Sequence, residues 1–208
     1  MSDFIKYIRT RHLQGSRKSG DDFELEDEPF ENLIGKYVVY EEKLDGSNVQ
    51  ISFSDNRELL LGSRGHYLMG GVREKRFAQL KIWANTYKND LYDILGTRYI
   101  MYGEDLECKH TIYYDTLPAY FMEFDVWDKE NNYFLSTQAR QRLLEGLDYH
   151  AVPIVYAGEA ISLEHLKSFI KKSLYDLRSK KAPMPWLGDE LRHLKVFLLN
   201  IPKYVVIL

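Results

Sequence analysis

The chain has 208 residues, of which 45% are hydrophobic and 28% are charged, and its net charge is −3. This length predicts one domain, at most with a small appendage, and it is enough to bury a sizeable core. The slight negative charge excludes a uniformly basic surface. Any contact with nucleic acid must therefore use local basic clusters, and the sequence offers three of them, at residues 9–11, 17–18 and 73–76.

Cysteine and histidine usage excludes several kinds of site. The single Cys108 rules out an internal disulfide and a cysteine-based zinc site, and it favours a reducing, cytoplasmic setting. The six histidines form no His-x-x-x-His pair. We expect no secretory signal, because Asp3, Lys6 and Arg9 interrupt the first ten residues. No apolar run approaches the roughly 20 residues of a membrane span, so no membrane partner is expected.

The first half of the chain reads mainly as strands. Residues 1–36 are irregular, and residues 20–28 predict an exposed acidic loop. The first clear strand begins at residues 37–40, and Asp45-Gly46 after it predicts a hairpin turn. A half-buried strand should follow, because three apolar residues alternate with polar ones. They are Val49, Ile51 and Phe53.

Strands and one helix are expected over the next fifty residues. Residues 58–61 predict a strand with Ser63-Arg64-Gly65 at its end, and residues 99–102 predict another that stops at Gly103-Glu104. Between them the spacing predicts a helix over 73–87 with one apolar face. That face carries Phe77, Leu80 and Trp83.

The second half mixes strands and capped helices. Residues 120–127 predict the strongest strand, with a turn at 128–132, and residues 153–156 predict a short one. Ser136 can cap a helix that runs to Leu147, and Ser162 can cap a second. The apolar face expected for the second helix consists of Leu163, Leu166, Phe169, Ile170 and Leu174.

The end of the chain is less regular. Residues 182–186 contain two prolines and should interrupt regular structure, whereas residues 196–208 are mostly apolar. Three interpretations of the apolar end stay open, namely a final strand, a segment that binds a partner, or an ill-folded terminus. We expect a domain over residues 1–178 and an atypical tail over 179–208.

Several groups with chemical potential fall where predicted strands end. They are Lys43 with Asp45, then Arg64, then Glu104, and finally the pair Glu123 and Asp125. A nucleotide site needs this mixture, because a cation contacts phosphate, carboxylates hold Mg²⁺ or a ribose hydroxyl, and a ring stacks on the base. Phe124 is the candidate ring. Each group alone is more often structural, and only their shared placement favours a site.

These pieces resemble motifs of the covalent nucleotidyltransferases, which include ATP-dependent DNA and RNA ligases and mRNA capping enzymes. Four matches occur in the family's order, so they are more specific than any one of them. They are Lys43-Leu44-Asp45-Gly46 with Asn48, then Ser63-Arg64-Gly65, then Tyr102-Gly103-Glu104, then Glu123-Phe124-Asp125-Val126. Asn48 and the segment 109–115 point to the RNA ligase branch. The resemblance covers about residues 5–175.

The resemblance implies a fold, a reaction and cofactors. The fold class is α+β, an adenylation domain with antiparallel sheets and flanking helices, expected to be incomplete at its C-terminus. Lys43 would attack the α-phosphate of ATP, release pyrophosphate and form lysyl-AMP. AMP would then pass to a 5′-phosphate end, which a 3′-hydroxyl joins. The cofactors would be ATP and Mg²⁺ or Mn²⁺, and the partner would be RNA or nicked nucleic acid, in an oligomeric state that stays open.

The resemblance also assigns roles to individual residues. Glu42 would contact adenine through the strand edge, while Asn48 would support the nucleotide and Phe124 would stack on the base. Arg64 and Glu104 would hold the ribose. Asp45 and Gly46 belong to the same nucleotide site, and Asp45 and Glu104 would be metal ligands. A free lysine amine is protonated at neutral pH, so the reaction also demands metal or desolvation near Lys43.

Two further family motifs are not found. One is a strand of the type Glu-Gly-apolar-x-apolar-Lys, and the other is Lys-x-Lys. Glu145-Gly146-Leu147 begins like the first but sits where a helix should end, which is an ordinary place for glycine. Lys195 stands alone. We therefore keep three alternatives to a ligase: a truncated, non-catalytic module that binds nucleotide or RNA, a capping-type guanylyltransferase, and a plain interaction domain.

Overall fold

The computed structural model describes residues 4–14, 26–108, 110, 112, 114–171, 173–175, 193–198 and 205–207. Residues 17–18, 20–25 and 182–186, for which a basic cluster, an acidic loop and an irregular segment are expected, lie outside this range. The chain divides into two compact units, which are described one at a time. Unit 1 comprises Met1–Tyr7, Asp45–Thr111 and Pro118–Ala151, and unit 2 comprises Ile8–Leu44, Ile112–Leu117 and Val152–Leu208.

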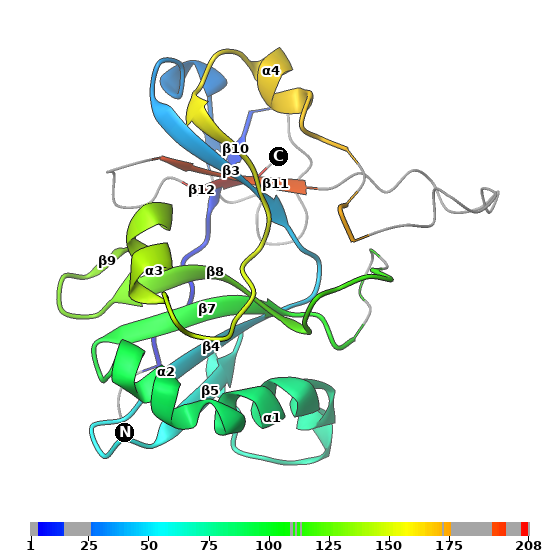
Figure 1. Cartoon of the computed structure of the whole chain (residues 1–208). Coiled ribbons are helices and arrows are strands. Elements are labelled where there is room, and N and C mark those ends of the chain that lie inside the picture. Colours follow the sequence, from blue (N-terminus) through cyan, green and yellow to red (C-terminus); the bar gives the residue numbers. More distant parts are fainter. Residues whose placement is uncertain are drawn as a thin grey trace. The chain divides into compact units, whose positions relative to one another are not determined.

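Unit 1 contains a six-stranded antiparallel sheet. Its strands, in spatial order, are β6 (His66–Tyr67), β5 (Leu59–Ser63), β4 (Ser47–Phe53), β7 (Tyr99–Asp105), β8 (Phe121–Asp128) and β9 (Tyr133–Phe134). Its helical segments are η3 (Val72–Phe77), α1 (Ala78–Thr86), α2 (Lys88–Leu95) and α3 (Thr137–Leu143). Figure 1 shows α1 and α2 along one side of the sheet, below β4 and β5.

One face of this sheet and the helices enclose the core of unit 1. Alternate residues of β4 point to this face, as the two-residue period requires, and they pack with Leu80 of α1 and Leu91 of α2. The prediction of a half-buried β4 is wrong, because Gln50 and Ser52 on its other face are also buried. The N-terminal segment packs on that other face, because the ring of Phe4 meets the ring of Tyr67 and the Tyr102 hydroxyl donates to the carbonyl oxygen of Ile5.

Unit 2 contains the second six-stranded sheet. Its strands, in spatial order, are β10 (Ile154–Glu159), β3 (Tyr37–Lys43), β11 (His193–Leu198), β12 (Val205–Ile207), β1 (Arg11–Leu13) and β2 (Asp27–Glu28). Its helical segments are η2 (Phe30–Asn32) and α4 (Leu163–Lys167). Val38 and Tyr40 of β3 pack against Leu166 of α4 in the core of this unit. Of the three interpretations of the apolar tail, the backbone supports strand formation in the described part, because β11 and β12 both pair within this sheet.

The α+β class with antiparallel sheets and flanking helices is confirmed, and most predicted elements are present. The unit 2 sheet departs from this pattern at β1, which pairs in parallel with both β12 and β2. The helix expected over 73–87 is a 3-10 segment followed by α1, and α2 was not anticipated. Both serine caps are confirmed, because Ser136 accepts from the Ala139 N–H and Ser162 from the His165 N–H. The second capped helix ends at Lys167, so Leu174 lies beyond it and is 58% exposed.

The turn after β8 is held by the fully buried carboxylate of Asp128. This carboxylate accepts hydrogen bonds from Arg98 Nη2 at 2.5 Å and from Asn131 Nδ2 at 2.8 Å. Burial alone would raise the pKa of Asp128, but the bonds from Arg98 and Asn131 outweigh it and lower the pKa to about 2. A lowered pKa means that the contribution to stability is present above the ordinary value of 3.8 and is lost as the pH falls toward 2.

We expect Asp128→Asn to lower the free energy of unfolding by about 2 kcal/mol at pH 7, because each unit of pKa shift corresponds to about 1.4 kcal/mol. The difference from the unchanged protein should narrow as the pH falls below 4. Urea unfolding at pH 7, 4 and 3 measures both effects. Glu130→Gln, which changes a 64% exposed side chain that also pairs with Arg98, is the control and should cost less than 1 kcal/mol. If the difference in free energy of unfolding between Asp128→Asn and the unchanged protein did not vary with pH, the ionised Asp128 carboxylate would not be its cause.

Candidate active site

Lys43 is the last residue of β3, the second strand from one edge of the unit 2 sheet. β3 pairs with β10 on one side and with β11 on the other, and His193 of β11 stands opposite Lys43 in the register. The Glu42 N–H donates to the carbonyl oxygen of Pro153 at 2.9 Å. The strand that presents Lys43 is thus bonded on both sides up to its last residues, which holds the lysine backbone in a rigid setting.

The two glutamates before Lys43 lie on opposite faces of β3. Val38 and Tyr40 face the core of unit 2, so the two-residue period of a strand puts Glu42 on that same face. Burial, and then the charge of Glu42, raise the pKa of Tyr175, which places this carboxylate near the tyrosine. Glu41, which is fully buried, shares the other face with Lys43. Glu41 was not among the predicted site residues, although the two-residue period of the strand places it beside Lys43.

The segment from Leu44 to Gly46 is not a hairpin turn, so that prediction is wrong. β3 and β4 belong to different sheets, and β4 pairs with β5 and β7 instead. Gly46 is needed because a Cβ at this position would collide with the carbonyl oxygen of Asp105. The Gly46 N–H donates to Glu104 Oε1 at 2.9 Å. The glycine therefore lets the Asp45-Gly46 backbone lie directly against the end of β7.

The face of the unit 1 sheet that points away from α1 and α2 is polar. Asn48 of β4 stands directly opposite Glu104 of β7, so their side chains share this face. In the next row, Gln50, Tyr102 and Asp125 stand opposite one another on β4, β7 and β8. The strand expected to stop at Gly103-Glu104 continues to Asp105, because both residues pair with β8.

A bulge in β8 brings Phe124 and Asp125 to this same face. Tyr102 pairs with Asp125 and Gly103 pairs with Glu123, so Phe124 is an extra residue in β8. The ring of Tyr7 meets the ring of Phe124 edge-on with centroids 5.1 Å apart, and the Tyr7 hydroxyl donates to Asp125 Oδ2 at 3.0 Å. Phe124 is 1% exposed. Nothing in the sequence pointed to Tyr7, which lies 118 positions from Asp125.

Glu123 does not share a face with Asp125, although the two were expected to form a pair at the end of a strand. β8 runs on to Asp128, and Glu123 stands opposite Gly103 on the side of the helices. Arg140 of α3 is buried there, with its Nε 3.6 Å from Glu123 Oε1, and its Nη1 donates to the carbonyl oxygen of Phe124. This buried pair therefore supports the bulge from behind. No motif in the sequence indicated the role of Arg140.

Arg64 lies at the end of β5, as expected, in a two-residue turn to β6. Ser63 and His66 pair across this turn. The φ angles of Arg64 and Gly65 are +48° and +138°, so both adopt the left-handed backbone that tight hairpins require. The Arg64 side chain is exposed, and Ser63 Oγ donates to the carbonyl oxygen of Asn48 at 3.2 Å. The turn is thereby tied to the same strand that carries Asn48.

The carboxylates of this face could hold a divalent ion whose other ligands come from the substrate. Asp45 and Glu104 are partly exposed carboxylates on one unit, joined through the bond from Gly46 to Glu104. Across the described residues, no three His, Cys, Asp or Glu side chains gather in a way that could hold a metal. Mg²⁺ is commonly held by one or two carboxylates together with substrate phosphates. Burial and the charge of Glu107 raise the pKa of the neighbouring Asp105 to about 7, which weakens its negative charge.

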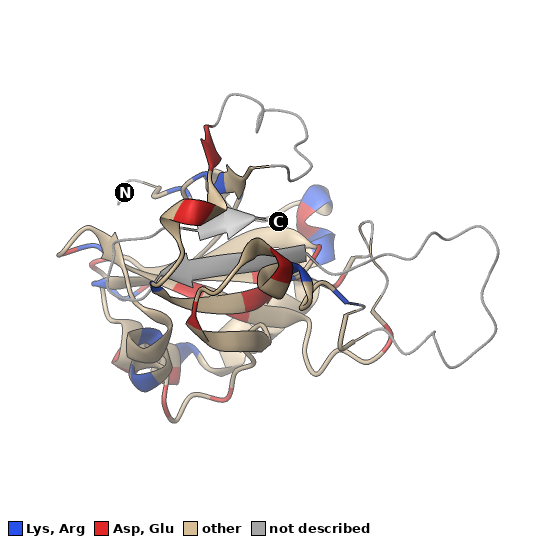
Figure 2. Cartoon of the chain, turned by 90° about the horizontal axis from the view of Figure 1, so that it is seen from above, with Lys and Arg blue, Asp and Glu red and all other residues tan. Residues whose placement is uncertain are grey.

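Charge is mixed along the described ribbon. Figure 2 shows basic and acidic segments interspersed rather than one long basic run. Of the three basic clusters in the sequence, residues 73–76 lie on η3, where Arg73 and Arg76 are exposed. No helix in the part of the chain that the structure describes is long and apolar enough to cross a membrane.

Comparison with known proteins bears on these residues. A model of the RNA ligase family matches residues 36–188, well over half of the chain and including Lys43, Arg64, Glu104 and Phe124. The chain belongs to the RNA ligase family. Membership confirms the resemblance that the four ordered motifs predicted. No curated protein matches the chain in sequence.

Solved structures of an RNA ligase from Naegleria gruberi share the fold. A mutant with ATP and Mn has a TM-score of 0.62 at 16% identity, and a mutant with AMP and Mn has 0.62 at 17% identity. In each case 86% of this chain covers 51% of that chain. The enzyme with PPi has a TM-score of 0.63 at 17% identity, with 100% of this chain covering 59% of that chain. The RNA ligase family member described here thus spans little more than half the length of these proteins.

Proposed function

We propose that the chain is an ATP-dependent ligase of RNA that forms lysyl-AMP on Lys43. The Lys43 amine attacks the α-phosphate of ATP, so a nitrogen–phosphorus bond forms, the bond to the β-phosphate oxygen breaks, and pyrophosphate leaves. The Lys43 ammonium gives up one proton to solvent before the attack and a second as the nitrogen–phosphorus bond forms, so the product keeps one N–H. A 5′-phosphate end then takes AMP from Lys43, and a 3′-hydroxyl displaces AMP to join the two ends.

The observation that carries the proposal is the sheet face that follows Lys43 in the chain. Within six residues of the lysine come the Asp45-Gly46 segment, bonded to Glu104, and Asn48, paired with Glu104. Lys43, the carboxylates and Phe124 all lie within residues 36–188, the range that the RNA ligase family model matches. The Naegleria gruberi structures contain ATP with Mn, AMP with Mn, and PPi, which supports the choice of nucleotide, metal and leaving group.

Each candidate residue has a part in this proposal. Asp45 and Glu104 would hold the divalent metal, which neutralises charge on the triphosphate when bound. Arg64 and Glu104 would hold the ribose and Asn48 the nucleotide. Phe124 would stack on the base after the ring of Tyr7 moves aside, because Phe124 is 1% exposed. Glu42, which lies on the face of β3 away from Lys43, would reach adenine only through its backbone at the strand edge. A cytoplasmic location is part of the same proposal.

A second candidate is a module that binds nucleotide or RNA without catalysis. The sequence favours it in one respect, because it contains no Lys-x-Lys and no strand of the type Glu-Gly-apolar-x-apolar-Lys. Incubation with α-labelled ATP or GTP and Mg²⁺ or Mn²⁺, followed by denaturation, separates the candidates. Label from ATP on the protein supports the ligase, label from GTP alone supports a capping-type enzyme, and ATP binding without label supports the module.

We expect Glu104→Ala to reduce the rate of labelling from ATP about 100-fold, the scale for one lost electrostatic group. Glu104→Gln separates two causes, because an amide oxygen can still accept from the Gly46 N–H but carries no charge. A loss in both variants indicates that the charge matters, and a loss in alanine alone indicates that the bond to Gly46 matters. Glu130→Ala, on the β8–β9 turn, is the matched control and should label normally. Normal labelling of Glu104→Ala would remove Glu104 from the site.

A further inference from the structure

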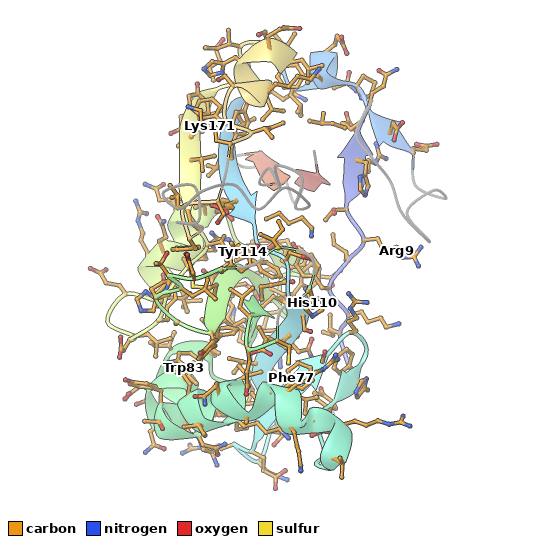
Figure 3. The ribbon with its side chains drawn as sticks, turned by 90° about the vertical axis from the view of Figure 1, so that its right-hand side faces the viewer. Arg9, Phe77, Trp83, His110, Tyr114 and Lys171 are labelled. Atoms are coloured by element: carbon orange, nitrogen blue, oxygen red, sulfur yellow. The ribbon has the colours of Figure 1, made fainter. Side chains whose placement is uncertain are left out.

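Unit 1 holds a small aromatic cavity on the helix side of its sheet. Its volume is about 160 Å³. It lies where α1, the start of β8 and the segment after α3 meet, and Figure 3 shows Trp83 on α1 at this place. The side chains that line it include Gln79, Trp83, Tyr120, Phe121, Tyr149 and His150. None of these residues belongs to the polar sheet face described above.

The aromatic wall of the cavity is held in place. The rings of Trp83 and Phe121 are stacked, with centroids 5.1 Å apart and planes inclined by 30°. Trp83 Nε1–H donates to the carbonyl oxygen of Asp148 at 3.2 Å, and the Tyr87 hydroxyl donates to Asp148 Oδ2 at 2.6 Å. The backbone carbonyl of His150 accepts from the Glu123 N–H at 2.8 Å, which ties the far wall to β8.

Size and charge restrict what this cavity can take. Its volume exceeds the room that one water needs, yet it is below the 300–1,000 Å³ of pockets for drug-sized ligands. One planar ring system, of the size of a nucleobase, suits it. The carboxylate of Asp148 stands beside the wall and raises the pKa of Tyr87, so it would repel a phosphate group. The chemistry therefore favours a neutral, flat and polar-edged ligand.

We propose that this cavity binds one unpaired base of an RNA strand. The base would stack on aromatic rings of the wall, as single-stranded nucleic acids do on proteins. Gln79, with an amide donor and acceptor, and His150 lie at the cavity and offer hydrogen bonds to the edge of a base. Tyr120 is 50% exposed, and a stacked base would cover it. The choice of RNA rests on the proposed function, but binding here does not require the reaction of Lys43.

The test titrates the whole chain into a single-stranded RNA that contains 2-aminopurine, a base whose fluorescence falls when it stacks. Binding should quench this fluorescence. Tyr120→Ala should weaken its apparent affinity about 10-fold, the scale of one lost stacking partner. Tyr133→Ala removes another tyrosine, 38% exposed on β9 and outside the cavity, and should leave the affinity unchanged. Equal weakening by both variants, or by neither, would overturn the proposal.

A second measurement identifies the cavity itself. The chain has three tryptophans, so Trp127→Phe and Trp186→Phe together leave Trp83 as the only one. Its emission should be quenched by the RNA and not by an abasic strand of the same length and charge. Quenching by both strands would show that phosphate binding is responsible, and quenching by neither would show that no base reaches Trp83.

The same titration in Lys43→Ala separates this proposal from the ligase reaction. Quenching that persists when labelling is lost supports a base site independent of adenylation. If labelling from ATP fails in the unchanged protein while quenching occurs, the proposed function fails and the base site stands. If labelling from ATP occurs and quenching does not, the base site fails and the proposed function stands.

Discussion

Lys43→Ala should reduce the label that ATP leaves on the protein to background. An alanine offers no nitrogen to form a bond with the α-phosphate, and no second lysine lies within five residues of position 43 on β3. Lys43→Arg should fail as well, although it keeps the positive charge, because a guanidinium does not lose its proton in proteins. Gel detection of protein-bound label after denaturation measures both variants. The effect should be a loss of at least 1,000-fold, on the order of losses seen when a nucleophile is removed.

Lys36→Ala is the matched control, because it removes a lysine just before β3, and it should label normally. Binding of ATP without reaction should persist in Lys43→Ala, since the remaining residues of the site are unchanged. Label that survives in Lys43→Ala would mean that another side chain carries AMP, and the assignment of the nucleophile would then be wrong.

Arg140→Ala should lower the free energy of unfolding by about 3–5 kcal/mol, the cost of leaving one partner of a buried ion pair alone. Arg140 is 1% exposed and Glu123 is fully buried, and the arginine also donates to the carbonyl oxygen of Phe124. Urea unfolding near neutral pH measures the loss. Arg142→Ala, which truncates an exposed arginine on the same helix, is the control and should cost less than 1 kcal/mol.

A double variant distinguishes a lost charge partner from lost packing. In Arg140→Leu with Glu123→Leu no buried charge is left uncompensated, so the cost should be well below the sum of the two single changes. Additive costs would show that the two side chains contribute independently. If the double variant folds, its labelling from ATP reports how far the bulge at Phe124 depends on support from α3.

The sequence predicted strands β3, β4, β5, β7, β8 and β10, because their residues are apolar or alternate with a period of two. It missed the short strands β1, β2, β6 and β9. It could not assign the predicted strands to two sheets. Asp45-Gly46 carries the usual dipeptide of a hairpin, yet Gly46 serves a close approach to Asp105 instead of a reversal of the chain. Such a contact joins residues about sixty positions apart, and nothing local records it.

Part of the candidate site was also predictable from the sequence. Asn48, Glu104, Phe124 and Asp125 emerged from motif order, and the register brings them to one face. Tyr7, Glu41 and Arg140 did not emerge. Tyr7 contacts Asp125, 118 positions away, through a hydrogen bond and Phe124 through its ring, and Arg140 reaches Glu123 and the carbonyl oxygen of Phe124 from α3. Glu41 is hidden by a neighbour with the same side chain. The roles of the site residues in the reaction stay predictions.

The extra residue in β8 has a consequence for how relatives of this chain should be compared. Residues before Phe124 and residues after it alternate in opposite phase, although both halves belong to one strand. An alignment built on hydrophobic alternation would therefore slip by one position across this point. A homologue shorter by one residue here would keep Asp125 and all later residues in register while losing the ring. Length variation at position 124 would thus be a simple genetic marker of whether a family member retains this part of the site.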